Sequence, residues 1–176
     1  NSMFNVKKLA FGAALLAASA VCFAAPKVEI VTSEGNIVVN LNEKAAPTTV
    51  ANFVKYANEG FYNGTIFHRV INNFMIQGGG FDRNLHQKST HAPIKLEDKN
   101  GLKNTVGTIA MARTNNPDSA TSQFFINLKD NDFLNGTSTK DGYAVFGEVV
   151  SGMDVVRKIG RAPTGSKGFM DDVPVR

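Results

Sequence analysis

Apolar and polar residues alternate over residues 27–41. Every second position is apolar from Val28 to Ile30 and again from Ile37 to Leu41, and the polar run 33–36 separates the two stretches. A period of two places successive side chains on opposite faces of an extended strand. The pattern therefore predicts a β-hairpin whose turn is the polar run.

The pattern changes to a helical period after Pro47, a residue suited to the first turn of a helix. Apolar residues then recur at spacings of three and four up to Gly60, at Val50, Phe53, Val54 and Ala57. This predicts an amphipathic helix whose apolar stripe packs on the core. A second, shorter helix is predicted over residues 152–160.

Several further stretches have the length and composition of short strands. They cover residues 65–71, 74–77, 105–112, 122–128 and 143–150, and polar or glycine-rich segments separate them. Many short strands with two helices predict a mainly β fold, a closed antiparallel barrel with helices at its ends. No repeat or linker divides this region, so we expect one domain.

Composition agrees with one folded domain. The chain has 176 residues, of which 43% are hydrophobic and 19% charged, so it can bury a core and is not expected to be disordered. Its net charge of +4 falls to about +2 without Lys7 and Lys8. So small an excess, with no run of basic residues, argues against a nucleic-acid partner.

The N-terminal segment has the features of an export signal. Asn1 and Ser2 are interpreted as a cloning remnant, and residues 3–24 as a secretory signal peptide with a charged start, an apolar middle and a cut after Ala24. The domain would then be residues 25–176, periplasmic and without stable membrane association once processed. An uncleaved anchor and lipidation of Cys22 are the alternatives. Since Cys22 is the only cysteine, a processed chain has no disulfide or thiolate site.

Strand alternation gathers a mixed set of side chains on one face of the predicted sheet. The set contains a cation, two amides and two large apolar residues: Arg69, Met75, Gln77, Gln123 and Phe125. These polar side chains could simply face water while the barrel buries the alternate positions. That reading leaves Met75 and Phe125 exposed, and an apolar patch rimmed by hydrogen-bond donors is typical of a binding site.

Other chemistries lack their motifs. The three histidines show no ligand spacing, and no G-x-S-x-G sequence is present. The run Gly78–Gly80 follows a strand, but no Lys-Ser or Lys-Thr follows it, so it is not a phosphate loop. We expect neither a metal nor a cofactor.

Four segments together resemble the cyclophilin-type peptidyl-prolyl isomerases, of the exported bacterial kind. They are residues 67–71 (FHRVI), 74–79 (FMIQGG), 110–113 (AMAR) and 122–126 (SQFFI), and the resemblance runs from Val28 to Pro174. It implies an eight-stranded antiparallel barrel capped by two helices. It also implies a closing strand after Pro174, where only two residues follow. We therefore expect a truncated final strand, and an open barrel edge beside residues 27–32 that favours self-pairing.

The resemblance also implies roles for individual residues. Arg69 matches the catalytic arginine. The substrate-binding residues that it implies are Phe74, Met75, Gln77, Ala112, Arg113, Thr114, Gln123, Phe125, Phe133, Leu134 and Tyr143.

Three of these positions depart from common family members. Phe133 replaces a tryptophan and Tyr143 a histidine of many eukaryotic members, which implies weak or no cyclosporin binding. Arg113 replaces a common asparagine. The family further implies a monomer.

The function implied is rotation of Xaa-Pro bonds in unfolded or flexible segments, which assists the folding of exported proteins. A non-catalytic proline-binding chaperone and a barrel that binds a small molecule are the competing hypotheses. His68 lies on the strand face opposite Arg69, and we expect it to be a buried, hydrogen-bonded structural residue.

Overall fold

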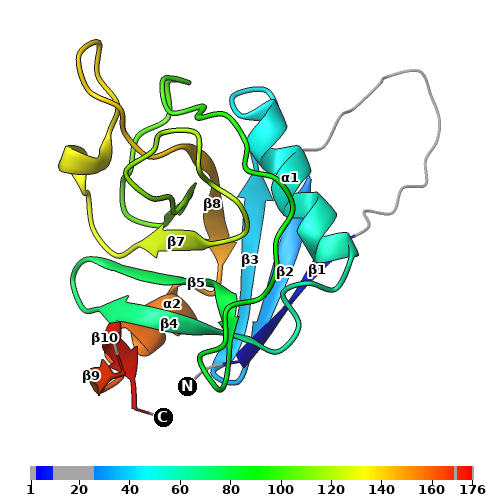
Figure 1. The fold of residues 1–176 in the computed structure, drawn as a ribbon, viewed down its shortest axis with the longest axis vertical. Helices are drawn as coiled ribbons and strands as arrows, with labels where there is room; N and C mark the ends of the chain where they lie inside the picture. Colours follow the sequence, from blue (N-terminus) through cyan, green and yellow to red (C-terminus); the bar gives the residue numbers. More distant parts are fainter. Residues whose placement is uncertain (1–2, 10–25, 169, 176) are drawn as a thin grey trace.

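The structure, a computed structural model, describes residues 3–9, 26–168 and 170–175 (Figure 1). Its helices are α1 (Pro47–Asn58), α2 (Met153–Gly160) and the 3-10 turn η1 (Asp132–Leu134). Its strands are β1 (Met3–Leu9), β2 (Lys27–Thr32), β3 (Gly35–Leu41), β4 (Thr65–Ile71), β5 (Met75–Asp82), β6 (Thr108–Met111), β7 (Phe124–Asn127), β8 (Val145–Ser151), β9 (Thr164–Lys167) and β10 (Met170–Pro174).

Eight strands close into an antiparallel barrel in the order β1-β2-β3-β8-β6-β7-β5-β4. The predicted hairpin is its β2–β3 pair, in which Thr32 lies opposite Gly35. Val28, Ile30, Ile37 and Val39 are fully buried, as the alternation predicts. The expected barrel architecture is thus confirmed.

Both predicted helices are present and bury their apolar stripes in the same core. Helix α1 begins at Pro47 and buries Val50, Phe53 and Ala57, and Phe53 packs against Phe124 with ring centroids 5.4 Å apart. Helix α2 buries Val156 and Ile159. In Figure 1, α1 lies across the sheet formed by β1 to β3, and α2 lies near β4 and β5.

The barrel has no open edge beside β2, so the expectation of a missing strand is wrong. Strand β1 pairs along β2 from Phe4 opposite Thr32 to Leu9 opposite Lys27. It also pairs with the start of β4, where Met3 lies opposite Ile66. The strand that closes the barrel therefore comes from the N-terminal segment, inside the range predicted as a signal peptide.

The end of the chain forms a feature that the sequence pattern did not predict, the two-stranded hairpin β9–β10. The predicted cleavage site after Ala24 and the alternative lipidation site Cys22 lie outside the described residues. Within the described residues, neither helix has the length and apolarity needed to cross a bilayer.

Candidate active site

Strand register brings three of the predicted site residues into one row across the barrel. Arg69 on β4 lies opposite Gln77 on β5, and Gln77 lies opposite Phe125 on β7. Directly opposed residues of antiparallel strands project from the same face. Val70, Ile76 and Phe124 project from the other face into the core. The predicted sharing of a face is therefore present, and Arg69 is exposed on the outside of the barrel.

An apolar cluster separate from the barrel core adjoins this row. It is built from Met75, Ala110, Phe125, Leu134 and Val145, with Phe74, Ala112 and Tyr143 packed against it.

The structure does not expose the apolar patch that the alternation predicted at Met75 and Phe125. Met75 is only 2% exposed and Phe125 only 4%, because residues of a distant loop, Leu134 and Tyr143, pack in the same cluster. The ring of Tyr143 meets that of Phe125 edge-on at 5.7 Å. The open part of the apolar surface is instead Phe133, 59% exposed, whose ring stacks on Phe74 at 5.7 Å.

Amides lie beside the same row, near the glycines of β5. Gln77 Nε2 donates a hydrogen bond to Gln123 Oε1 at 3.0 Å. A side chain at Gly80 would place its Cβ 2.5 Å from Gln123 Cγ, so the side chain of Gln123 would have to shift to admit one. The backbone N–H of Ala112 donates to the carbonyl of Gln123 at 3.0 Å. The predicted residues Gln77, Ala112 and Gln123 are thus adjacent.

The guanidinium of Arg113 packs on the protein itself. Its Nε and Nη2 donate to the carbonyl oxygen of Gly142 at 3.1 and 2.9 Å, and its Cζ lies 4.5 Å from the ring centroid of Tyr143. The Gly142 N–H donates in turn to the buried carboxylate of Asp98 at 2.8 Å. Asp98 and Arg113 therefore hold Gly142 from both sides and fix the ring beside it. Thr114, exposed, is tied to Ser119 by two hydrogen bonds.

Burial alone would raise the pKa of Asp98. The hydrogen bond from the Gly142 N–H and the neighbouring Lys99 outweigh that effect, so the pKa is lowered from its ordinary value. Asp98 is therefore ionised when it accepts this bond near neutral pH.

Three asparagines beneath the apolar cluster were not predicted. Asn127, fully buried, donates to Asn104 Oδ1 at 3.0 Å and accepts from Asn131 Nδ2 at 2.8 Å. Asn131 also donates to the carbonyl of Phe74, and Asn104 to that of Leu134. This amide network (Asn104, Asn127 and Asn131) connects the backbones of two residues of the apolar cluster. A single asparagine in a strand or loop carries no periodic signal that would have identified it.

His68 is buried, as expected, and its ring packs on Phe81 at 4.6 Å. Its Nδ1 has no hydrogen-bond partner among the described residues, so that part of the expectation is wrong. Desolvation by burial, together with the charge of Arg69, lowers the pKa of His68 to about 4. The ring is therefore neutral at physiological pH.

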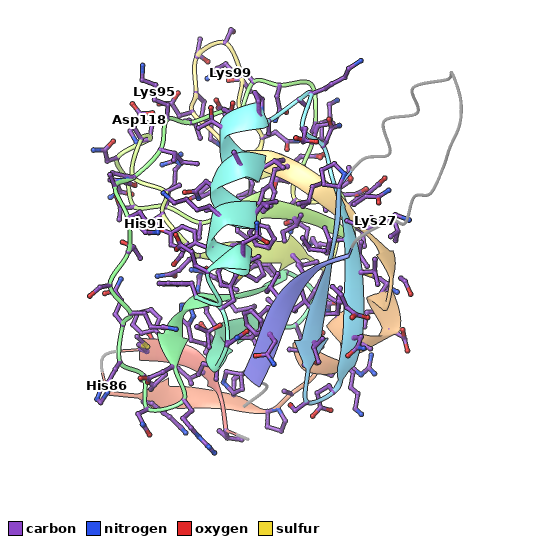
Figure 2. All side chains as sticks on the ribbon, turned by 90° about the vertical axis from the view of Figure 1, so that its right-hand side faces the viewer. Lys27, His86, His91, Lys95, Lys99 and Asp118 are labelled. Atoms are coloured by element: carbon purple, nitrogen blue, oxygen red, sulfur yellow. The ribbon has the colours of Figure 1, made fainter. Side chains whose placement is uncertain are left out.

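The other two histidines lie apart from each other, each beside a different carboxylate (Figure 2). His91 lies beside α1, where it contacts Glu59 at 2.7 Å, whereas His86 lies near Asp82. No cluster of three or more potential metal ligands occurs within residues 3–9, 26–168 and 170–175. A cavity of about 770 Å³ is lined among others by Asn40, Leu102 and Glu148. It shares no residue with the row, but Val145 of the apolar cluster also lines it.

Comparison with known proteins identifies the family. The family model of the cyclophilin-type peptidyl-prolyl cis-trans isomerases matches residues 27–176. The chain belongs to this family. It is 56% identical to a peptidyl-prolyl cis-trans isomerase of Acinetobacter baylyi over 169 residues, which are 96% of this chain and 90% of the relative. It is 61% identical to peptidyl-prolyl cis-trans isomerase B of Escherichia coli, covering 81% of this chain and 89% of that protein.

Solved structures agree with this assignment. A cyclophilin-type isomerase of Cryptosporidium parvum, crystallised in the presence of the dipeptide Ala-Pro, superposes with a TM-score of 0.70. It is 26% identical, and the match covers 85% of this chain and 91% of that one. This cyclophilin is therefore a peptidyl-prolyl cis-trans isomerase. Neither competing hypothesis, the non-catalytic chaperone or the small-molecule barrel, has comparable support.

Proposed function

We propose that this cyclophilin accelerates the rotation of Xaa-Pro bonds in unfolded or flexible segments of exported proteins, with Arg69 as its catalytic group. The observation that carries the proposal is the row of Arg69, Gln77 and Phe125 beside the apolar cluster. The three groups on this face suit the three parts of an Xaa-Pro unit. The cation suits the imide nitrogen, the amide suits the preceding carbonyl, and the apolar wall suits the proline ring. The Ala-Pro dipeptide used with the Cryptosporidium relative supports the same substrate class.

The chemistry required is modest. Conjugation of the peptide C–N bond produces a rotation barrier of roughly 18–20 kcal/mol, and an Xaa-Pro bond isomerises unaided in tens to hundreds of seconds. At the transition state the prolyl nitrogen has lost conjugation and can accept a hydrogen bond. A donor from Arg69 to that nitrogen would stabilise the twisted state more than either planar state, and only such differential binding accelerates the step.

Surrounding residues make that hydrogen bond effective. The apolar cluster would hold the proline ring and exclude water, and exclusion of water strengthens an electrostatic contact. Gln77 and Gln123 would fix the amide preceding the proline. A barrier lowered by about 7 kcal/mol corresponds to a rate gain of roughly 10⁵-fold. No bond is broken, so proton transfer by His68 is not required.

A protease-coupled isomerisation assay on a short Xaa-Pro peptide tests the assignment of Arg69. Removing one donor that acts on the transition state typically lowers the rate by roughly 10²–10³-fold, and we expect that loss in Arg69→Ala with peptide binding largely retained. The rate of Arg69→Lys should lie between those of the parent and Arg69→Ala, because lysine keeps the positive charge but lacks the planar guanidinium with its several donors. Arg157→Ala, an exposed arginine on α2, serves as control. Unchanged turnover in Arg69→Ala would refute the assignment.

Export to the periplasm is the second part of the proposal. It is supported by the charged start and apolar middle of residues 3–24 and by the small residues before Ala25. N-terminal sequencing of the protein recovered from a periplasmic fraction tests it. A chain that begins at Ala25 there supports export, whereas an uncleaved chain confined to the cytoplasm contradicts it.

A further inference from the structure

The row of Arg69, Gln77 and Phe125 can be followed across two more strands. Phe125 on β7 lies opposite Ala110 on β6, and Ala110 lies opposite Val145 on β8. Val145 also lines the cavity of about 770 Å³. The row therefore leads to this cavity, which begins two strands from Phe125, or roughly 10 Å at the usual spacing of strands.

A second residue belongs both to the lining of the cavity and to the surroundings of the apolar cluster. Leu102 lines the cavity and packs against the cluster. Asn100 holds it in place, because Asn100 Oδ1 accepts a hydrogen bond from the Leu102 N–H at 2.9 Å. Asn100 Nδ2 donates to the carbonyl of Val145, also at 2.9 Å. One asparagine thus joins the two residues through which the cavity contacts the cluster.

The cavity combines apolar side chains with exposed charges. Its large aliphatic residues are Leu41, Leu102 and Val145, and two of them, Leu41 and Val145, are each 1% exposed. Four exposed charged residues also line it, Glu43, Lys44, Lys103 and Glu148. Within the part of the chain that the structure describes, no ion pair involves any of these four. Two carboxylates and two ammonium groups therefore remain for a ligand.

We propose that this cavity binds a short extended peptide segment in which one large aliphatic side chain stands between a basic and an acidic residue, and that the bound segment stabilises the apolar cluster. The cavity volume is within the range of sites that bury small ligands. Neighbouring side chains of an extended segment point to opposite sides, so the aliphatic one can enter while its long charged neighbours bend back to the exposed charges. Ligand charges of both signs complement a lining that carries both signs.

The effect on the apolar cluster rests on the proposed function, whereas binding in the cavity does not. Leu102 and Val145 lack partner atoms on the side that faces the cavity, and a bound segment supplies them. It thereby holds the cluster in place, and a preorganised wall binds a proline ring more tightly. Linkage makes the effect reciprocal, so a proline peptide bound at the row tightens binding in the cavity by the same factor.

The first test is a nitrogen-15 NMR titration of the full chain with two proline-free probes. They are acetyl-Lys-Leu-Glu-amide and acetyl-Glu-Leu-Lys-amide, because a lining with both charges does not fix the direction of the peptide. We expect one to bind per chain, with amide shifts at residues 101–103 and 147–148. Replacing its leucine by serine should weaken binding at least tenfold. Equal binding of the serine peptide, or shifts confined to other residues, overturns the proposal.

The second test reverses one charge of the cavity. Lys103→Glu leaves a single lysine in the lining, and Lys95→Glu makes the same change at an exposed lysine outside it. At low salt, Lys103→Glu should bind acetyl-Lys-Leu-Lys-amide at least as tightly as the better mixed-charge probe. The parent and Lys95→Glu should both prefer the mixed-charge probe. The same preference in all three proteins overturns the charge match.

The third test measures the coupling without turnover. A short Xaa-Pro peptide is titrated by NMR with and without the better probe at saturation. We expect the probe to lower the Kd of the Xaa-Pro peptide at least twofold, and Leu102→Ala to reduce that factor. An unchanged Kd in the parent overturns the coupling.

The outcome for the cavity is independent of the outcome for Arg69. Arg69→Ala should bind the proline-free probes as the parent does. A failed assignment of Arg69 therefore leaves the first two tests unaffected, and a cavity that binds neither probe leaves the isomerase assay of Arg69→Ala unaffected.

Discussion

Replacing Asn127 by alanine is the sharpest test of how the region of the candidate active site is supported. The side chain is fully buried and makes three hydrogen bonds, to Asn104, Thr108 and Asn131, of 3.0, 2.9 and 2.8 Å. Truncation leaves Asn104 Oδ1 without its donor, while Thr108 and Asn131 each keep another partner. A buried polar group left unsatisfied costs about 1–3 kcal/mol, and each other bond contributes about 1 kcal/mol. We therefore expect the free energy of unfolding to fall by about 4 kcal/mol.

Urea denaturation followed by far-ultraviolet circular dichroism measures this loss, since the chain has no tryptophan. With a slope of about 2 kcal/mol per molar urea, the midpoint should fall by about 2 M. Asn72→Ala is the matched control, because Asn72 is exposed and its side chain bonds only the next backbone N–H. It should change the free energy by less than about 0.5 kcal/mol. If the two variants unfold at the same midpoint, the amide network does not support the site.

Three further predictions concern neighbouring residues. Because the pKa of His68 is about 4 when folded and near 6.5 when unfolded, only the unfolded chain gains a proton between these values. The free energy of unfolding should therefore fall by on the order of 3 kcal/mol as pH drops from 6.5 to 4. Urea titrations at several pH values should show that His68→Asn loses most of this pH dependence, whereas the control His86→Asn keeps it. Asp98→Ala removes the acceptor of the Gly142 N–H and should lower stability by about 2 kcal/mol and raise KM for an Xaa-Pro peptide more than it lowers kcat. Asp141→Ala removes a carboxylate that contacts Lys99 but is not the acceptor of the Gly142 N–H. It should do neither, and equal effects in both variants would contradict the role of Asp98. Phe133→Trp should increase inhibition by cyclosporin in the isomerase assay, and unchanged inhibition would exclude this exposed position as a cause of the weak binding that the resemblance implies.

Local patterns predicted the parts of the fold that depend on local spacing. The β2–β3 hairpin and the start of α1 at Pro47 follow from periodicity and from a residue with a fixed backbone angle. Alternation also assigned Arg69, Gln77 and Phe125 to one face correctly, because adjacent positions of a strand must point to opposite sides.

Alternation could not show what covers that face. Met75 and Phe125 were expected to be exposed, yet Leu134 and Tyr143 reach them from a loop whose path no local pattern encodes. The same reason explains the amide network, whose members are brought together only by the closed barrel. The hairpin β9–β10 was missed because glycine and proline weaken a strand pattern.

Strand β1 was missed for a different reason. A lysine pair next to an apolar run is a strong export signature, and it obscured the shorter alternation of Phe4, Asn5 and Val6. One stretch of sequence can fit both an export signal and a barrel strand, since each requires little more than a few apolar residues near a positive charge.

If residues 3–24 act as the export signal that we propose, folding and secretion compete for the same segment. A leader whose first residues lie inside a closed barrel could not be threaded through a translocation channel, so a newly made chain would have to reach the membrane before its barrel closes. Slower closure would then favour secretion, and a variant that weakens the grip of Phe4 on the aromatic core should leave the cell interior more efficiently.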